Sequence, residues 1–237
     1  MYVMRLIIVV FVALATLPRG ANADSEELLT EIIVSSHRYA RLRLDYPGSI
    51  ERIAAEPIGW TGHHHVGELL DQVAGAWIVR GSGQDHQTAL RSPVLGGPGS
   101  CGGFLILEDG IPTRPAGFCN TNQLIEVNSE QARAIEVIRG PGNALFGSNA
   151  VHGVVNVLMP GPGDPLIAGA GVEYGANDYV RASSLLPFGD DASWLAAFNY
   201  ADDGGFRDDS GFRQGKLHLK RAWLTGDNSF TLAATMT

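Results

Sequence analysis

The run Ala134–Met159 joins two short apolar segments through four glycines. The first segment alternates, with Ile135 and Val137 on one side of a predicted strand and Glu136 on the other. A Gly-Pro-Gly triplet ends that strand, because proline lacks a backbone donor and glycine permits positive φ. A second apolar segment follows at 154–158. The pattern predicts a tightly folded strand–turn–strand unit.

Glycine-rich loops between strands are also typical of phosphate-binding sites. Here no Lys-Ser or Lys-Thr follows the glycines, and G-P-G-N-A-L-F-G has the spacing of neither nucleotide fingerprint. We therefore do not expect a phosphate-binding enzyme. The sequence shows no nucleophile–base pair and no metal cluster, so we expect no enzymatic activity, no cofactor and no bound metal. The net charge of −8 leaves no basic footprint for a nucleic acid.

The same run, I-E-V-I-R-G-P-G-N-A-L-F-G-S-N-A-V-H-G-V-V-N-V, resembles the signature that ends the plug domain of TonB-dependent outer-membrane receptors. F-L-I-L-E-D-G-I-P, at 104–112, resembles another segment of that domain, and its Asp109-Gly110 between apolar strands predicts a hairpin turn. The resemblance implies an α+β plug over residues 37–160, a small mixed β-sheet with short helices. The signature positions in this chain are Asp109, Gly110, Glu136, Arg139, Gly140, Pro141, Gly147, Gly153 and Asn156.

Besides Asn143, which sits after Gly142, and V-A-G-A at 73–76 in place of P-G-V, the chain departs from the family pattern at two places. Ala134 stands where an arginine is usual before I-E-V, and Arg91 is followed by Ser-Pro where the family has glycine. The second departure makes the turn after Arg91 hard to predict.

The N-terminus has the three parts of a secretory signal peptide, which we place at residues 1–23. Arg5 is the positive start, 6–17 is apolar, and A-N-A fits the small-x-small rule for cleavage between Ala23 and Asp24. The apolar run is shorter than a transmembrane helix. The sequence therefore predicts export.

The segment Thr30–Ser36 lies in a predicted N-terminal extension, 24–36, and its β-branched residues favour extended backbone. By position it resembles the TonB box of the family. The resemblance implies that a TonB-type energy-transducing protein of the inner membrane pairs with it as an added strand. The residues of this expected partner site are Thr30, Glu31, Ile32, Ile33, Val34 and Ser35.

Cys101 and Cys119 are the two cysteines of the chain. An exported protein meets an oxidising compartment, so we expect one disulfide between them. A redox or metal-binding pair is the alternative, but the spacing is not C-x-x-C and no histidine is near. Three adjacent histidines, His63–His65, point in different directions and cannot easily share an ion. We expect them at the solvated start of a helix whose apolar face contains Val66, Leu69, Leu70 and Val73.

A Pro/Gly/Asn-rich loop, 113–123, precedes the signature and contains Cys119, so the expected disulfide with Cys101 would hold it. In the resembled family such loops form the outward apex of the plug and help to bind substrate. Four side chains are expected to face a small-molecule ligand, although a plain surface loop is an equal alternative. These are Arg114, Phe118, Asn120 and Asn122.

From residue 166 onward the sequence alternates, after a Pro/Gly linker at 161–165. Five segments of about ten residues suit antiparallel strands that are apolar outside and polar inside, as in a membrane β-barrel. A soluble sandwich with one wet face has the same period. Trp194, Tyr200 and Trp223 near strand ends are consistent with an aromatic girdle.

Five strands are too few to close a membrane barrel, which takes about 8 or more. We therefore expect an incomplete barrel and a truncated or partial chain. The combined prediction is an outer-membrane receptor of a Gram-negative bacterium that takes up a scarce nutrient, such as an iron–siderophore or cobalamin, with the plug gating the barrel. The alternative is a soluble periplasmic plug-like interaction module without transport.

Overall fold

The structure is a computed structural model that describes residues 33–34, 41–42, 48–81, 83–94, 103–115, 122–147, 149–161, 164, 168–190, 193–225 and 228–237. Several predictions fall outside these residues: the signal peptide with Ala23 and Asp24, the residues Thr30, Glu31, Ile32 and Ser35, the pair Cys101 and Cys119, and Phe118 and Asn120. Within the TonB-box-like segment, Ile33–Val34 forms strand β1. It pairs antiparallel with β2, Arg41–Leu42.

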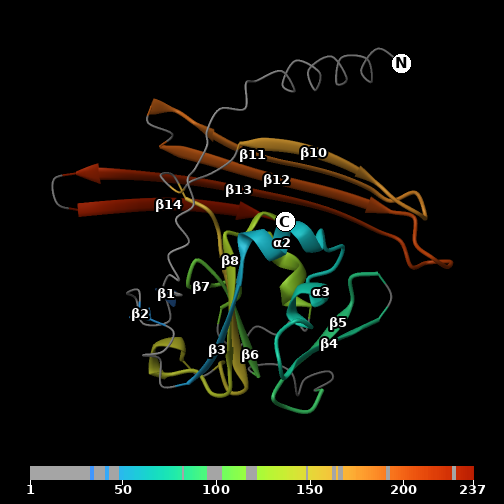
Figure 1. The fold of residues 1–237 in the computed structure, drawn as a ribbon, viewed down its shortest axis with the longest axis horizontal. Helices are drawn as coiled ribbons and strands as arrows, with labels where there is room; N and C mark the ends of the chain where they lie inside the picture. The colour runs from blue at the N-terminus through green and yellow to red at the C-terminus, as the bar shows by residue number, and fades with distance from the viewer. Residues whose placement is uncertain are drawn as a thin grey trace. The chain divides into compact units, whose positions relative to one another are not determined.

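A mixed five-stranded sheet is the centre of the first half (Figure 1). Its order is β3-β8-β9-β6-β7, with β6 and β9 parallel and the other neighbours antiparallel. The strands are β3 (Ser49–Ala54), β6 (Phe104–Glu108), β7 (Ile111–Pro112), β8 (Ala134–Arg139) and β9 (Gly153–Leu158). The predicted strand–turn–strand unit is confirmed, since β8 and β9 are paired neighbours joined by the Gly-rich turn, which contains the 3-10 helix η5 (Ala144–Phe146).

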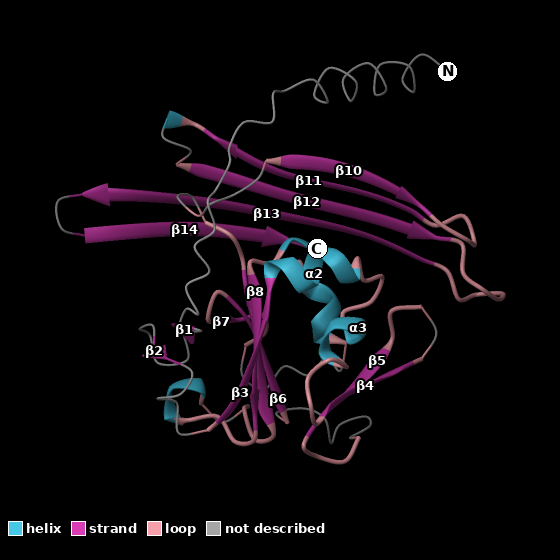
Figure 2. Ribbon diagram, viewed as in Figure 1, coloured by secondary structure: helices cyan, strands magenta, loops and turns pink. Residues whose placement is uncertain are grey.

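Both faces of this sheet are apolar and covered, which explains why β8 and β9 are buried along nearly their whole length. One face packs against two helices and a separate two-stranded sheet, and the helices lie beside the sheet in Figure 2. These elements are α2 (Ala55–Thr61), α3 (Gly67–Leu70), β4 (Ala76–Arg80) and β5 (His86–Leu90). The other face packs against Ala150 and Phe146 from the Gly-rich turn.

The helix predicted after the three histidines is present but short. Val66, Leu69, Leu70 and Val73 are all buried in the core, as the period predicted, yet α3 covers only Gly67–Leu70. The preceding helix α2 was not predicted. The expectation that the histidines are solvated is wrong for two of them, because His63 is 2% exposed and His65 1%.

The predicted hairpin at Asp109-Gly110 is confirmed. Glu108 pairs with Ile111, so the loop has two residues, and both have positive φ, +50° at Asp109 and +80° at Gly110. Such backbone angles are those of a type I′ turn, for which Asp-Gly is a preferred sequence. Two 3-10 helices follow, η3 (Gln123–Glu126) and η4 (Ser129–Gln131). Asn128 precedes η4 without capping it, since its side chain instead donates to Gln131.

A second, antiparallel sheet contains the alternating region, in the sequential order β10-β11-β12-β13-β14 (Figure 1). We call it the wall sheet. Most of its large apolar side chains lie on the outward face and most of its polar side chains on the inward face, as the alternation predicted, although Leu195 and Ala197 of β12 are buried on the inward face. The strands are β10 (Gly169–Tyr174), β11 (Val180–Phe188), β12 (Trp194–Asp203), β13 (Phe212–Thr225) and β14 (Asn228–Met236). None of the helices in the described ranges is long and apolar enough to cross a membrane.

Candidate functional site: the interface between the mixed sheet and the wall sheet

The inward face of β13 contacts the first half of the chain at four successive inward positions. Gln214, Lys216, His218 and Lys220 are spaced two apart, so their side chains leave the strand on the same side. Gln214 donates to the carbonyl of Ile125 at 2.6 Å. The other three meet acidic side chains. One strand therefore bonds to segments that lie about a hundred residues earlier.

Lys216 and Glu130 form the most buried of these ion pairs. The Lys216 Nζ lies 2.8 and 3.0 Å from the two carboxylate oxygens, and the two side chains are 4% and 15% exposed. Burial by itself would raise the pKa of Glu130, but the attraction of Lys216 outweighs it and the pKa lies below its usual value. The Glu130 carboxylate is thus held in its charged form beside the Lys216 amine, in a site that water barely reaches.

Lys220 joins three elements. Its Nζ lies 2.8 Å from Asp109 Oδ2 and donates to the carbonyl of Met159 at 3.3 Å. The second oxygen of Asp109 accepts from the Met159 backbone N–H at 3.0 Å. The signature aspartate therefore connects the β6–β7 turn, the end of β9 and the wall sheet.

Glu108 is the partner of His218. The His218 Nδ1 lies 3.1 Å from Glu108 Oε1, and Thr235 of β14 donates to the same oxygen. An ionised carboxylate only accepts, so we assign the imidazole proton to Nδ1. Burial raises the pKa of Glu108, but the hydrogen bonds from His218 and Thr235 outweigh it, so the pKa is below its usual value.

The three adjacent histidines lie at a second contact with the wall sheet. The His63 Nε2 is 2.9 Å from the Ser129 hydroxyl, and Arg181 of β11 donates to the His63 carbonyl at 2.6 Å. His64 stacks on Tyr179 with ring centres 4.0 Å apart. His65 has different partners, since its Nδ1 accepts from the Gly67 N–H at 2.9 Å and its Nε2 lies 3.3 Å from the Gln84 carbonyl. The prediction that these side chains diverge is thereby confirmed, although two of the three are buried rather than solvated.

Burial lowers the pKa of His63 and of His65 to about 4. Nearby cations add to the effect, Lys216 at His63 and Arg80 at His65, whereas Glu130 opposes it at His63. Both imidazoles are therefore neutral at pH 7. No group of three or more His, Cys, Asp or Glu side chains among the described residues is arranged to hold a metal ion.

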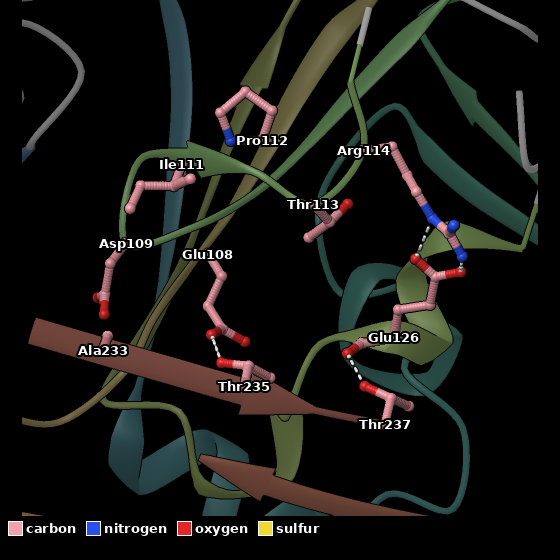
Figure 3. Close-up of a pocket in the computed structure, with 10 residues that line it drawn as sticks. All are labelled: Glu108, Asp109, Ile111, Pro112, Thr113, Arg114, Glu126, Ala233, Thr235 and Thr237. Atoms are coloured by element: carbon pink, nitrogen blue, oxygen red, sulfur yellow. Dashed lines mark hydrogen bonds and ion pairs between the residues drawn. The ribbon is translucent and has the colours of Figure 1, made fainter. Parts of the chain in front are cut away.

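A cavity of about 480 Å³ opens between the β6–β7 turn, η3 and β14 (Figure 3). Its lining includes the carboxylates Glu108, Asp109 and Glu126 and the guanidinium of Arg114. Arg114 was predicted to face a ligand. It does line this cavity, but its guanidinium is held by both oxygens of the Glu126 carboxylate. Any ligand that used Arg114 would share it with that carboxylate.

Asn122, the other described residue of the predicted apex, lines a different cavity. This one has a volume of about 370 Å³ and also contacts Asp85 and His86. Asn122 accepts from the His86 backbone N–H at 3.0 Å through Oδ1 and donates to Asp85 at 3.4 Å. The structure therefore does not bring Arg114 and Asn122 together.

The other signature residues have structural contacts. Glu136 is 1% exposed and stands opposite Arg52 on β3, while Asn156 accepts from the Gly110 N–H at 2.9 Å. Arg139 donates to the carbonyl of Ala74. Gly140 and Gly147 have positive φ on either side of the exposed Pro141 and η5. The signature thus specifies how this region folds.

Gly153 is required for a different reason, close packing. A Cβ at this position would lie 2.6 Å from Leu90 Cδ1 and 2.7 Å from the Ile138 carbonyl. Only glycine lets β9 approach both neighbours this closely.

Sequence reasoning missed Glu108, Glu130 and the lysines as interface residues. The alternation did put Lys216, His218 and Lys220 on the polar side of a strand. No sequence pattern points to their carboxylate partners, because the two members of each pair lie 86 to 111 positions apart in the chain.

Residues 43–154 match the family model described as TonB-dependent Receptor Plug Domain. Three solved structures share the fold. The first is the pyoverdine outer membrane receptor FpvA from Pseudomonas aeruginosa bound to pyoverdine, with a TM-score of 0.68, 15% identity, and coverage of 86% of this chain and 29% of that chain. The second is the alcaligin outer membrane receptor FauA from Bordetella pertussis, with a TM-score of 0.60, 17% identity, and coverage of 85% of this chain and 34% of that chain. The third is the ferric yersiniabactin uptake receptor FyuA from Yersinia pestis, with a TM-score of 0.61, 18% identity, and coverage of 79% of this chain and 31% of that chain.

This chain spans about a third or less of the length of those three proteins. At these identities the likeness concerns the fold. That fold is the one described above, a mixed sheet with short helices followed by an open antiparallel sheet. The family model, the shared fold and the signature agree that residues 43–154 of this chain form a TonB-dependent receptor plug domain.

Proposed function

We propose that this chain is the plug and first wall strands of an outer-membrane receptor of a Gram-negative bacterium. The receptor takes up a small scarce nutrient, such as an iron–siderophore or cobalamin, and the plug gates the pore. Residues 1–23 are the signal peptide, 37–160 the plug, 161–165 the linker and 166–237 the first strands. The observation that carries the proposal is the plug bonded to the inward, polar face of a sheet whose outward face is apolar.

The outward face supports a membrane location. Large apolar side chains are exposed along it, at positions where a soluble sheet with a wet face has polar residues. These are Val172, Tyr174, Leu186, Phe188, Phe198, Leu217, Trp223, Phe230, Leu232 and Met236.

Aromatic rings gather at one end of the wall strands. Trp194 stacks on Phe188, Trp223 stacks on Phe230, and Arg221 lies 5.0 Å from the centre of the Trp194 ring. Aromatic and cationic side chains favour the membrane–water boundary. Tyr200 lies toward the opposite end of its strand, near Asp202.

Energy for transport comes, in this proposal, from a TonB-type protein that adds a strand at Thr30–Ser35. Two neighbouring residues of this segment, Ile33–Val34, are extended, as strand addition requires. Arg114, Phe118, Asn120 and Asn122 are proposed to contact the substrate, from two separate cavities in the case of Arg114 and Asn122. The proposed disulfide between Cys101 and Cys119 would hold the loop between them.

Uptake measured in cells that produce this receptor tests the proposal. Deleting residues 30–36 should abolish energised uptake while substrate binding at the cell surface persists, because the deletion removes the partner site and leaves the plug. Uptake at the normal rate would contradict the TonB-dependent mechanism. Cell fractionation tests the location, since freely soluble periplasmic protein would favour a plug-like interaction module without transport.

A further inference from the structure

The chain contains 15 arginines but only two lysines, and both lysines lie on the inward face of β13. Lys216 is 4% exposed at its side chain and Lys220 13%. Lysine is ordinarily among the residue types least often buried. The side-chain amines of both lysines, which would ordinarily be exposed to solvent, are therefore largely buried.

The hydrogen-bond acceptors of both lysine ammonium groups belong to the plug. Within the described part of the chain, the hydrogen bonds of Lys216 end on Glu130, and those of Lys220 end on Asp109 and the carbonyl of Met159. No strand of the wall sheet supplies a counter-charge to either lysine among these contacts. The carboxylate partners come from two separated plug segments, the β6–β7 turn and η4.

Opposite charges at a fixed spacing specify how the plug is aligned along the inward positions of β13. Lys216 and Lys220 stand four residues apart, and their carboxylate partners are held by a rigid hairpin and a 3-10 turn of the plug. Sliding the plug by one inward position would place Glu130 beside His218 and would leave Lys216 buried without its carboxylate. An uncompensated buried charge is strongly unfavourable, so one register is selected.

We infer that the inward row of β13 is a docking site for the plug that is already complete in the first five strands. The plug then seats on the open sheet before the wall closes, and seating does not depend on later strands. This inference concerns assembly and depends on the plug fold, not on which substrate is transported.

Because the chain has only two lysines, the acylation of each one can be followed separately. We would refold the whole chain in detergent micelles, treat it with an amine-acylating reagent, and follow acylation of Lys216 and Lys220 by mass spectrometry. In the docked chain both lysines should react at least about tenfold more slowly than in the urea-unfolded chain, since a tenfold protection needs only about 1.4 kcal/mol. Equal rates would overturn the inference, because the open sheet would then not hold the plug.

Reversing the charges on the plug tests whether the docked plug, rather than the wall sheet alone, protects the two lysines from acylation. Glu130→Arg combined with Asp109→Arg should remove the protection of both lysines, and the milder pair Glu130→Gln and Asp109→Asn should reduce it if the reversed chain does not refold. Protection that persists in both variants would overturn the inference, since the sheet alone would then cover the lysines.

Two matched variants complete the test. Asp202→Arg disrupts an exposed pair with Arg213 in the wall sheet and should leave acylation unchanged. The swap Glu130→Lys with Lys216→Glu keeps the pair but moves one amine to the plug, and the amine introduced at position 130 should again be protected. Loss of protection in the Asp202 variant, or failure of the swap to restore it, would show that the lysines do not report docking by charge.

Discussion

Lys216 and Glu130 are 86 positions apart in the chain, yet they share two contacts of 2.8 and 3.0 Å in a nearly dry interface. Lys216 belongs to a wall strand and Glu130 to a 3-10 turn of the plug. This pair joins the plug to the wall sheet by a salt bridge, in addition to the shape complementarity of the two surfaces.

Removing one member of the pair should destabilise the protein strongly. Lys216→Met leaves the Glu130 carboxylate buried without compensation, and we expect a loss of about 3–5 kcal/mol in the free energy of unfolding. Adding Glu130→Gln should recover much of it. Arg213→Ala is the control, because its pair with Asp202 is exposed and should contribute less than about 1 kcal/mol. Chemical denaturation in detergent measures all four chains, and equal losses at Lys216 and Arg213 would contradict the assignment.

Acidification should weaken the plug through His63 and His65. Both pKa values fall to about 4 in the folded state from 6.5. Between these pH values the unfolded chain binds more protons than the folded chain, so stability is full above pH 6.5 and falls as the pH drops toward 4. Each histidine should contribute a loss of roughly 3 kcal/mol. In His63→Gln the slope of unfolding free energy against pH over this window should decrease, and an unchanged slope would remove His63 as a cause.

Replacing Gly153 with alanine should disturb the plug sheet. The new Cβ would meet the Leu90 side chain and the Ile138 carbonyl at distances that no real Cβ tolerates, so β9 must shift. Overpacking of this kind costs about 1–3 kcal/mol. Gly171→Ala in β10 is a matched strand control, since the nearest atom would be the Ser183 hydroxyl at 3.7 Å. A melting temperature in Gly153→Ala as high as in the control would be inconsistent with the close approach.

An arginine on the outward face should impair membrane insertion in proportion to depth. Phe198 lies in the middle of β12 and is exposed, so Phe198→Arg should cost about 2–4 kcal/mol in a bilayer. Tyr174 lies at the end of β10, where the same substitution should cost about 0–1 kcal/mol. Unfolding from lipid vesicles gives both values. Equal, small effects would favour a water-facing sheet and the soluble alternative.

Local patterns accounted for much of the fold. The alternation of Ile135 and Val137, the Asp109-Gly110 turn and the five period-two segments each predicted an element that the structure contains, because backbone preference and side-chain direction act over a few residues. The prediction for the histidines failed in part. Burial of His63 and His65 depends on Ser129, Gln84 and the wall sheet, and no local pattern reports those neighbours.

The sequence alone determined the five strands of the alternating tail, the side of each strand that is mostly polar, and the family signature, since these depend on spacing along the chain. Only the tertiary structure decided which carboxylate meets which lysine, and that Arg114 and Asn122 line separate cavities. The reason is physical: a charge pair depends on distance in space, and Glu108, Asp109 and Glu130 lie beside residues 214–220 only through the packing of two separate sheets.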